Sequence, residues 1–501
     1  MIELFTVHAS HGTQFLGPYS QYGWNHPGPT LFYLLAPFYE LSGRTLLGLN
    51  AGALVINIVS LALLAWVAAR RADDAPPFAV FTIALFPLLM LFVAREPDVI
   101  TSIWNPHVAL LPFAALMTLA AAGMSGDAWV LPLMAVLASF VSQTHLAFAP
   151  ASAALLLSTF AVLAVRAWRR ADRRVALERW SVLAIAAAQG LWILPVSEQL
   201  RSQSHPGNMT AIWRFFFSAA SGPGQSFGDA WRAWSGMLVG VVRPDFDLAY
   251  GVPFATSSSG WPAALSLVMM GALGAVVVRS WRARRAADGA LAGACLISAI
   301  VGFWSVLNIH GTIGDYQVFW LALVGVVRAA TIVAAGVDIA RASRPHPRGR
   351  PWDARIARIA AVLIVIGAAV VGHTRLARTA SGALPSPNDA VVRALTEQIF
   401  HGMPATGGRQ PLIRVDAGMW PVVPGILVQL SRAAIPFTLD RDQTALFGDE
   451  WLTTGREDVL MTICGPNLHK KLAGRPGNVV LAASAGVFVD GISLVDAPQY
   501  R

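Results

Sequence analysis

The sequence predicts an α-helical polytopic membrane protein with a small α/β domain at its C-terminal end. Of its 501 residues, 55% are hydrophobic and 13% are charged, whereas a soluble domain carries about 25% charged residues. About ten apolar runs precede residue 375, and a spanning helix needs roughly 20 such residues. After residue 385, helix-like and strand-like segments alternate, as they do in α/β domains.

The apolar runs define a multispanning domain over residues 46–375. They lie at 46–69, 77–94, 105–123, 128–145, 147–165, 180–196, 261–279, 289–307, 317–337 and 357–374. The stretch 197–260 between the sixth and seventh runs is long enough to form a large loop.

Arginines gather in alternate links between these runs and so predict the orientation in the membrane. The richest links are 166–179, 279–285 and 341–358. Because positive residues favour the cytoplasmic side, these links lie inside. The extracytoplasmic face then holds residues 1–45, the loop 197–260 and the C-terminal domain 385–501. The same clustering accounts for the net charge of +9 without nucleic acid as a partner.

Residues 1–45 form the first extracytoplasmic loop in this scheme. Prolines and glycines surround Trp24, Asn25 and His26 and stop any helix there. The apolar run that starts at Leu31 is too short to span, so we predict a helix at the membrane surface. An ordinary connecting loop is the alternative interpretation of this stretch.

An extracytoplasmic N-terminus has no evident export route, because neither a signal peptide nor a spanning run precedes it. We therefore expect a first transmembrane helix upstream of Met1 that this sequence lacks. The alternative is that residues 1–45 fold differently and that the number of spans differs by one.

The C-terminal domain, residues 385–501, begins with an N-cap signal at Asn388 and a helical pattern of apolar residues. We predict strands at 411–416, 435–440, 458–465 and 478–481, and a helix at 422–434. No glycine-rich phosphate loop occurs in the sequence, so no nucleotide site is predicted. Two cysteines, Cys295 and Cys464, provide no disulfide framework.

Polar side chains lie at the ends of apolar runs on the predicted outer face. Examples are His107, Gln143 and His145. A polar group at such a position needs a hydrogen-bond partner or water. For each residue the partner is either a ligand or, in the alternative interpretation, another group of the protein. Because several of these helix ends lie on one face, we predict a polar cavity there.

A lipid-linked activated sugar suits a cavity that faces away from cytoplasmic ATP. Its phosphate would meet arginine or histidine, and tyrosine or tryptophan rings would stack on the sugar. A carboxylate would accept the proton of the acceptor hydroxyl as a general base. The sequence identifies no cofactor and no metal-ligand spacing, although carboxylates could hold a divalent cation.

Several motifs resemble multispanning bacterial glycosyltransferases of the GT-C superfamily, which includes protein O-mannosyltransferases, lipid A aminoarabinose transferases and arabinofuranosyltransferases. The similar segments, within roughly residues 1–330, are GPYSQYGWNHPGP with FYLLAPFY, then 103–107, 142–145 and 206–208. The resemblance implies inverting transfer of a sugar from a polyprenyl-phosphate donor to a cell-envelope glycan, lipid or protein. It also implies a bacterial inner-membrane location and two surface helices in the first outer loop.

Such enzymes usually place an acidic base just after their first transmembrane helix, which this sequence lacks. Either Glu3 is the base or, as we favour, the true base was lost upstream; Glu96 and Asp98 are further candidates for a base or a metal ligand. The residues expected to line the donor pocket are Tyr19, Trp24, Asn25, His26, Trp104, Asn105, His107, Gln143, His145, Arg201 and Asn208. Among them, Arg201 is the expected phosphate contact.

Two other functions fit parts of the pattern. A transporter or flippase of lipid-linked sugars would also have about ten spans, but internal repeats or polar groups at mid-membrane depth would then be expected. A truncated, non-catalytic membrane scaffold is the third interpretation.

Arg328 lies within the ninth apolar run. It is either a buried partner for a lipid phosphate or, as we expect, a residue that follows an earlier end of the span and snorkels to the inner surface.

Overall fold

The computed structural model describes residues 1–20, 22–168, 170–202, 206–217, 223–243, 260–342, 351–382, 388–403, 410–440, 443, 447 and 451–494. Parts of the predicted loop 197–260 and the boundary near residue 385 lie outside these ranges. Contacts divide the chain into two compact units. The helical unit comprises residues 50–193 and 214–377, and the mixed unit comprises residues 1–49, 194–213 and 378–501.

Each of the ten predicted apolar runs forms a helix. The helices are α3 (Leu46–Asp74), α4 (Pro76–Arg95), α6 (Leu110–Ser125), α7 (Leu131–Thr144), α8 (Ala149–Ala167), α9 (Ala171–Arg201), α12 (Trp261–Arg282), α13 (Ala286–Leu307), α15 (Trp320–Ala342) and α16 (Pro351–Ala380). Among the described residues, nine helical segments are long and apolar enough to cross a membrane, and α7 belongs to a shorter apolar segment. The predicted helical membrane fold is therefore confirmed.

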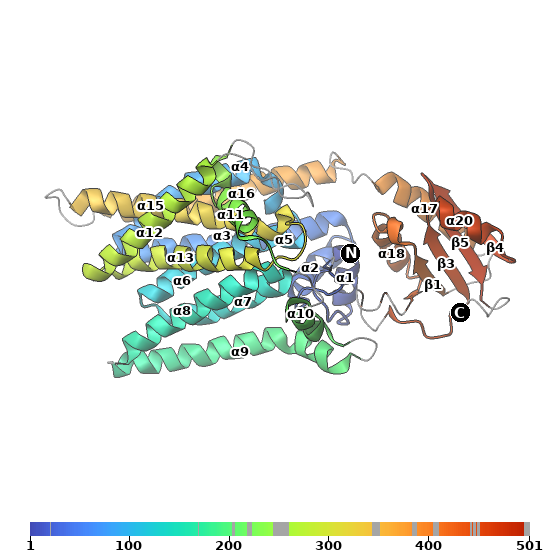
Figure 1. Ribbon diagram of the computed structural model, residues 1–501, viewed down its shortest axis with the longest axis horizontal. Helices are drawn as coiled ribbons and strands as arrows, with labels where there is room; N and C mark the ends of the chain where they lie inside the picture. Colours follow the sequence, from blue (N-terminus) through green and yellow to red (C-terminus); the bar gives the residue numbers. More distant parts are fainter. Residues whose placement is uncertain are drawn as a thin grey trace. The chain divides into compact units, whose positions relative to one another are not determined.

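The helices α6, α8 and α13 of the helical unit run side by side (Figure 1). Almost every residue of α6 is buried. Its run of alanines, with Gly123 near the end, allows this close packing, because small side chains let neighbouring helices approach. At Gly123 a Cβ atom would come within 2.4 Å of the Thr159 side chain in α8.

The prediction that Arg328 snorkels from the end of a span is wrong. Helix α15 continues past it to Ala342, and its side chain is fully buried. Its guanidinium donates to the Leu238 carbonyl (3.1 Å) at the end of α11 (Phe227–Leu238). Gly325 permits this approach, since a Cβ there would lie 2.1 Å from the same carbonyl oxygen. A helix end that needs a donor thus holds the arginine inside the protein.

The mixed unit contains a five-stranded sheet in the order β2-β1-β3-β5-β4. Its strands are β1 (Pro411–Val415), β2 (Thr438–Leu439), β3 (Val459–Cys464), β4 (Asn478–Ser484) and β5 (Val487–Ser493). Strand β1 pairs in parallel with β2 and β3, whereas β5 is antiparallel to β3 and β4. The predicted α/β character of the C-terminal region is confirmed, and β5 is a strand that the sequence analysis did not predict.

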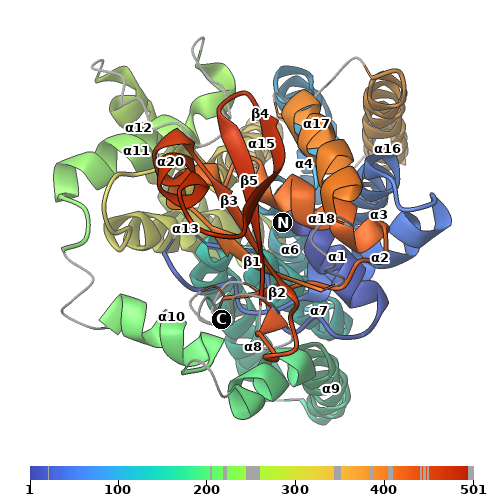
Figure 2. The same cartoon turned by 90° about the vertical axis from the view of Figure 1, so that its right-hand side faces the viewer.

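Helices cover both faces of this sheet (Figure 2). Helix α20 (Pro466–Ala473) lies on one side, and α17 (Asp389–Gly402) and α18 (Val423–Arg432) lie on the other. Leu395 of α17 and Leu427 of α18 pack with Met461 of β3 in one buried cluster.

The first residues of the chain complete the core of the mixed unit. Helices α1 (Ile2–Ser10) and α2 (Thr30–Leu41) contribute Phe5 and Phe32, whose rings meet edge-on at 5.3 Å. Phe5 also contacts the ring of Phe447 (6.2 Å), and all three rings are fully buried. Helix α2 lies where a short surface helix was predicted, but its buried face packs on protein.

Candidate functional site

The loop around Trp24, in the mixed unit, is a small hairpin. Ser20 N–H donates to the Trp24 carbonyl (3.1 Å), and His26 N–H donates to the Pro18 carbonyl (2.8 Å). The Trp24 and His26 rings meet edge-on, with 5.6 Å between their centroids. Gly17 lies so close that a Cβ would be 2.3 Å from the His26 carbonyl oxygen. The glycines and prolines of this stretch therefore build a compact, buried loop.

Asn208, the first residue of α10 (Asn208–Phe217), holds this loop through its side-chain amide. Its Oδ1 accepts from Asn25 N–H and its Nδ2 donates to the Asn25 carbonyl, both at 2.8 Å. The backbone N–H of Asn208 donates in turn to the two carboxylate oxygens of Glu198, at 3.1 and 3.0 Å. All three residues are buried. Asn25 and Asn208, which the sequence analysis selected separately, thus form a pair of hydrogen bonds with each other.

Tyr19 and Arg201 are the more exposed of the predicted residues in this unit. Tyr19 pairs with Asn25 across the hairpin, and its side chain is 40% exposed. Arg201 is exposed at the end of α9. Its predicted contact with a phosphate stays a prediction.

Glu3, one of the predicted bases, takes part in an ion pair within the mixed unit. Its carboxylate accepts from the Tyr39 hydroxyl at 2.8 Å and pairs with the Arg432 guanidinium of α18. Burial and the Glu3 charge raise the pKa of Tyr39 to about 12. This geometry favours a structural role for Glu3.

In the helical unit, aromatic side chains enclose His107. Its ring stacks on Phe319 at 5.5 Å and meets Trp104 edge-on at 4.8 Å, measured between centroids. Both ring nitrogens are buried and lack a hydrogen-bond partner among the described residues. Buried polar atoms almost always have a partner. The imidazole therefore has hydrogen-bonding capacity that the described protein groups do not use.

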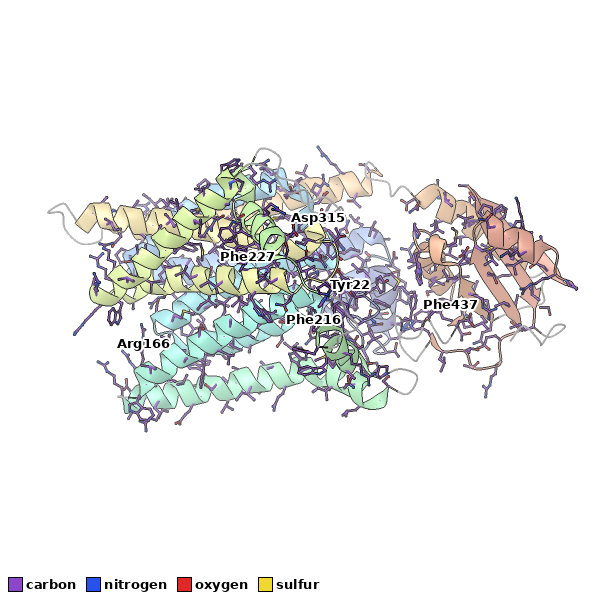
Figure 3. The ribbon with its side chains drawn as sticks, viewed as in Figure 1. Tyr22, Arg166, Phe216, Phe227, Asp315 and Phe437 are labelled. Atoms are coloured by element: carbon purple, nitrogen blue, oxygen red, sulfur yellow. The ribbon has the colours of Figure 1, made fainter. Side chains whose placement is uncertain are left out.

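Tyr316 and Asp315 extend the same cluster, although the sequence analysis did not select them as site residues. They begin the short helix α14 (Asp315–Val318), and Asp315 is labelled in Figure 3. The Tyr316 ring lies 5.9 Å from Trp104 and 6.4 Å from His145. Asp315 is 5% exposed, and its Oδ1 accepts from Tyr316 N–H at 2.6 Å. The available signal was the polar turn that precedes the ninth apolar run.

Asn105 and Gln143 make structural hydrogen bonds beside this cluster. The Asn105 amide donates to the Thr144 carbonyl at 3.1 Å, and the Gln143 amide donates to the Leu191 carbonyl at 2.9 Å. The first bond joins the start of α5 (Asn105–Val108) to the end of α7, and the second joins the end of α7 to α9. Both side chains thus position the helix ends that carry His107 and His145.

The two remaining predicted carboxylates follow α4. Glu96 is its C-cap and is 9% exposed. Asp98, in the short 3-10 helix Pro97–Ile100, forms an ion pair with Arg375 of α16. No group of three His, Cys, Asp or Glu side chains in the described ranges could hold a metal ion.

The structure thus brings some of the predicted residues together, in one group of contacts in each unit. Trp24, Asn25, His26 and Asn208 meet in the mixed unit. In the helical unit, Trp104 and His107 contact each other, and the Tyr316 ring links Trp104 to His145.

Two solved structures share the fold of this chain. They are ArnT from Cupriavidus metallidurans bound to undecaprenyl phosphate and the same protein in the apo state. They are 15% and 14% identical to this chain, with a TM-score of 0.50 each, and the match covers 98% of this chain and 92% of ArnT. No family model and no curated protein matches the sequence. The predicted fold, a helical membrane domain followed by a small α/β domain, is therefore one that this chain shares with ArnT.

Proposed function

We propose that this protein is a membrane glycosyltransferase. It moves a sugar from a polyprenyl-phosphate donor to an extracytoplasmic cell-envelope acceptor, in the inner membrane of a bacterium. The anomeric configuration inverts, with a carboxylate as the general base. A fold shared with ArnT along 98% of the chain supports the enzyme class, and undecaprenyl phosphate bound to that ArnT supports the donor class.

The single observation that carries the site is the buried imidazole of His107, which has no hydrogen-bond partner among the described residues and lies within an aromatic cluster. A phosphate oxygen or sugar hydroxyl that reaches His107 would satisfy a ring nitrogen that lacks a described protein partner. The rings of Trp104 and Tyr316 provide flat apolar surfaces on which a sugar can stack. We assign donor binding to this cluster.

Several carboxylates compete for the role of base. Glu3 and Asp98 each form an ion pair with an arginine, so both carboxylates already have a charged partner within the protein. Asp315 is buried and accepts from the backbone N–H of Tyr316, whose ring belongs to the histidine-aromatic cluster, and Glu96 is buried at the end of α4. The base would take the acceptor hydroxyl proton as that oxygen attacks the anomeric carbon, and the polyprenyl phosphate leaves.

Undecaprenyl phosphate is the probe that tests this proposal. His107→Ala should weaken its binding to the detergent-solubilised protein by about 10- to 100-fold, since hydrogen bonds to charged groups are worth about 1.5–3 kcal/mol. His373→Ala is the matched control, because His373 is exposed on α16. Equal affinity of the wild type and His107→Ala would overturn the site assignment.

Transfer is measured separately as sugar lost from the lipid and gained by envelope material. Glu96→Gln and Asp315→Asn should retain undecaprenyl phosphate binding, and the variant that lacks the base should lose transfer. A flippase would instead leave the sugar attached to its lipid. If the lipid-linked sugar stays intact after incubation with folded wild-type protein and envelope material, the transferase assignment is contradicted.

A further inference from the structure

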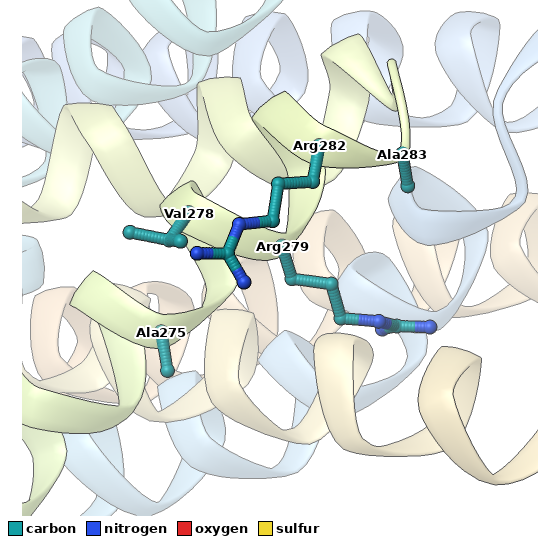
Figure 4. Close-up of a pocket in the computed structure, with 5 residues that line it drawn as sticks. All are labelled: Ala275, Val278, Arg279, Arg282 and Ala283. Atoms are coloured by element: carbon teal, nitrogen blue, oxygen red, sulfur yellow. The ribbon is translucent and has the colours of Figure 1, made fainter.

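A groove with a volume of about 620 Å³ lies at the C-terminal end of α12. Five side chains from α12 and its C-cap line the groove, and Figure 4 shows them. They are Ala275, Val278, Arg279, Arg282 and Ala283. Two of these side chains are cationic and three are apolar. The groove therefore combines a site for negative charge with a site for hydrocarbon.

The described arginines in and beside the groove outnumber the described carboxylates there. Asp338 of α15 lies 3.8 Å from the Arg279 guanidinium and also pairs with Arg285. The buried Asp288 carboxylate also interacts electrostatically with Arg279 and Arg285, so these two arginines face two carboxylates. Arg282 is exposed and pairs with no carboxylate among the residues that the structure describes. Its planar guanidinium, with five N–H donors, matches the geometry of a phosphate.

Exposed apolar side chains continue from the groove along α12. Trp281 is 81% exposed and Val278 is 46% exposed. Tryptophan concentrates at the boundary between bilayer and water, and arginines at a helix end reach the headgroup region. Because α12 is one of the helices long and apolar enough to cross a membrane, Arg279 and Arg282 lie where lipid phosphates would meet its end.

We propose that this groove binds the headgroup of an anionic phospholipid. The phosphodiester contacts the guanidinium groups of Arg279 and Arg282, and an acyl chain lies along Val278 and Ala275. This binding goes beyond the transfer reaction, because the groove contains none of the residues assigned to donor binding. The bound lipid would neutralise the charge of Arg282, which pairs with no carboxylate in the described part of the chain.

Native mass spectrometry of the full-length protein, titrated with phosphatidylglycerol or phosphatidylcholine, tests the proposal. The wild type should bind phosphatidylglycerol at least about tenfold more tightly, since each basic residue contributes about 1 kcal/mol with anionic lipid. The double variant Arg279→Gln/Arg282→Gln should lose this preference. Arg284→Gln, which removes one positive charge from a residue outside the groove, should keep it.

Two results would overturn the proposal. One is equal affinity of the wild type for the two lipids, which needs no variant and so does not depend on variant folding. The other is an equal loss of preference in Arg284→Gln and the double variant, which would indicate diffuse attraction to a basic surface. Undecaprenyl phosphate binding by the double variant should be unchanged, which separates this test from the test of the transferase.

Discussion

Replacing Asn208 by alanine would remove the amide that holds the Trp24 loop. The side chain makes two hydrogen bonds to the Asn25 backbone, at 2.8 Å each. Asn25 is fully buried, so water does not reach its N–H and C=O groups in the folded loop. The variant therefore leaves two buried backbone groups without their partner.

A buried group left without its hydrogen bond costs about 1–3 kcal/mol, and the two groups share one loop that can partly relax. We expect a loss of about 2–4 kcal/mol in the free energy of opening this loop. That loss corresponds to a roughly 30- to 700-fold faster exchange of the Asn25 amide hydrogen if local opening controls exchange.

Hydrogen–deuterium exchange on the purified protein measures this effect directly. Asn388→Ala is the matched control, since its amide makes one exposed hydrogen bond, to the Pro421 carbonyl. The control should leave exchange in the Trp24 loop unchanged. Unchanged exchange at Asn25 in the Asn208→Ala variant would refute the claim that the Asn208 side chain holds this loop. Equal effects of the two variants would refute it as well.

Three further predictions follow from other contacts and from the arginine distribution. Burial alone would raise the pKa of Glu457, but hydrogen bonds that include three neighbouring threonines lower it from 4.5 to about 2; wild type should therefore exceed Glu457→Gln in stability by about 3 kcal/mol at pH 7. This advantage is complete above about pH 4.5 and disappears as the pH falls towards 2, which denaturant titrations at both ends will show. Thermal unfolding should show that Arg432→Gln costs about 1–3 kcal/mol, because Glu3 loses its charged partner and keeps only the Tyr39 hydroxyl. Loss of the exposed Arg44–Glu40 pair should cost less than about 1 kcal/mol in the same assay. Reporter fusions should place residue 172 in the cytoplasm and residue 450 outside it, and the opposite result would reverse the topology.

Much of the fold could be predicted because its signal is local. An apolar run of sufficient length specifies a helix regardless of its neighbours, so all ten runs form helices. The short strand β3 was equally evident from its apolar residues, which only Thr462 interrupts. Strand β5 was missed because Asp490 and Gly491 interrupt its apolar pattern. In the folded chain, these residues pair with Thr462 and Met461 of β3.

The site was harder to predict, because its contacts join residues far apart in the chain. Asn25 and Asn208 each carried a polar signal, but no sequence pattern indicated that they bond to each other across 183 positions. Glu3 was considered as a base because of its position in the sequence. Its partner Arg432 lies on a helix of the C-terminal domain, so only the fold reveals the ion pair.

The packing of α1 against the C-terminal domain has a consequence for synthesis of the protein. Glu3 and Arg432 are 429 positions apart, and ribosomes add about 5–20 residues per second. The interval between synthesis of Phe5 and synthesis of Phe447, its partner in the core, is therefore roughly 20–90 seconds. During this interval the apolar face of α1 needs a temporary cover, such as the bilayer surface or a chaperone. The C-terminal domain, made without residues 1–49, would in turn expose the face that Phe5 and Phe32 normally fill.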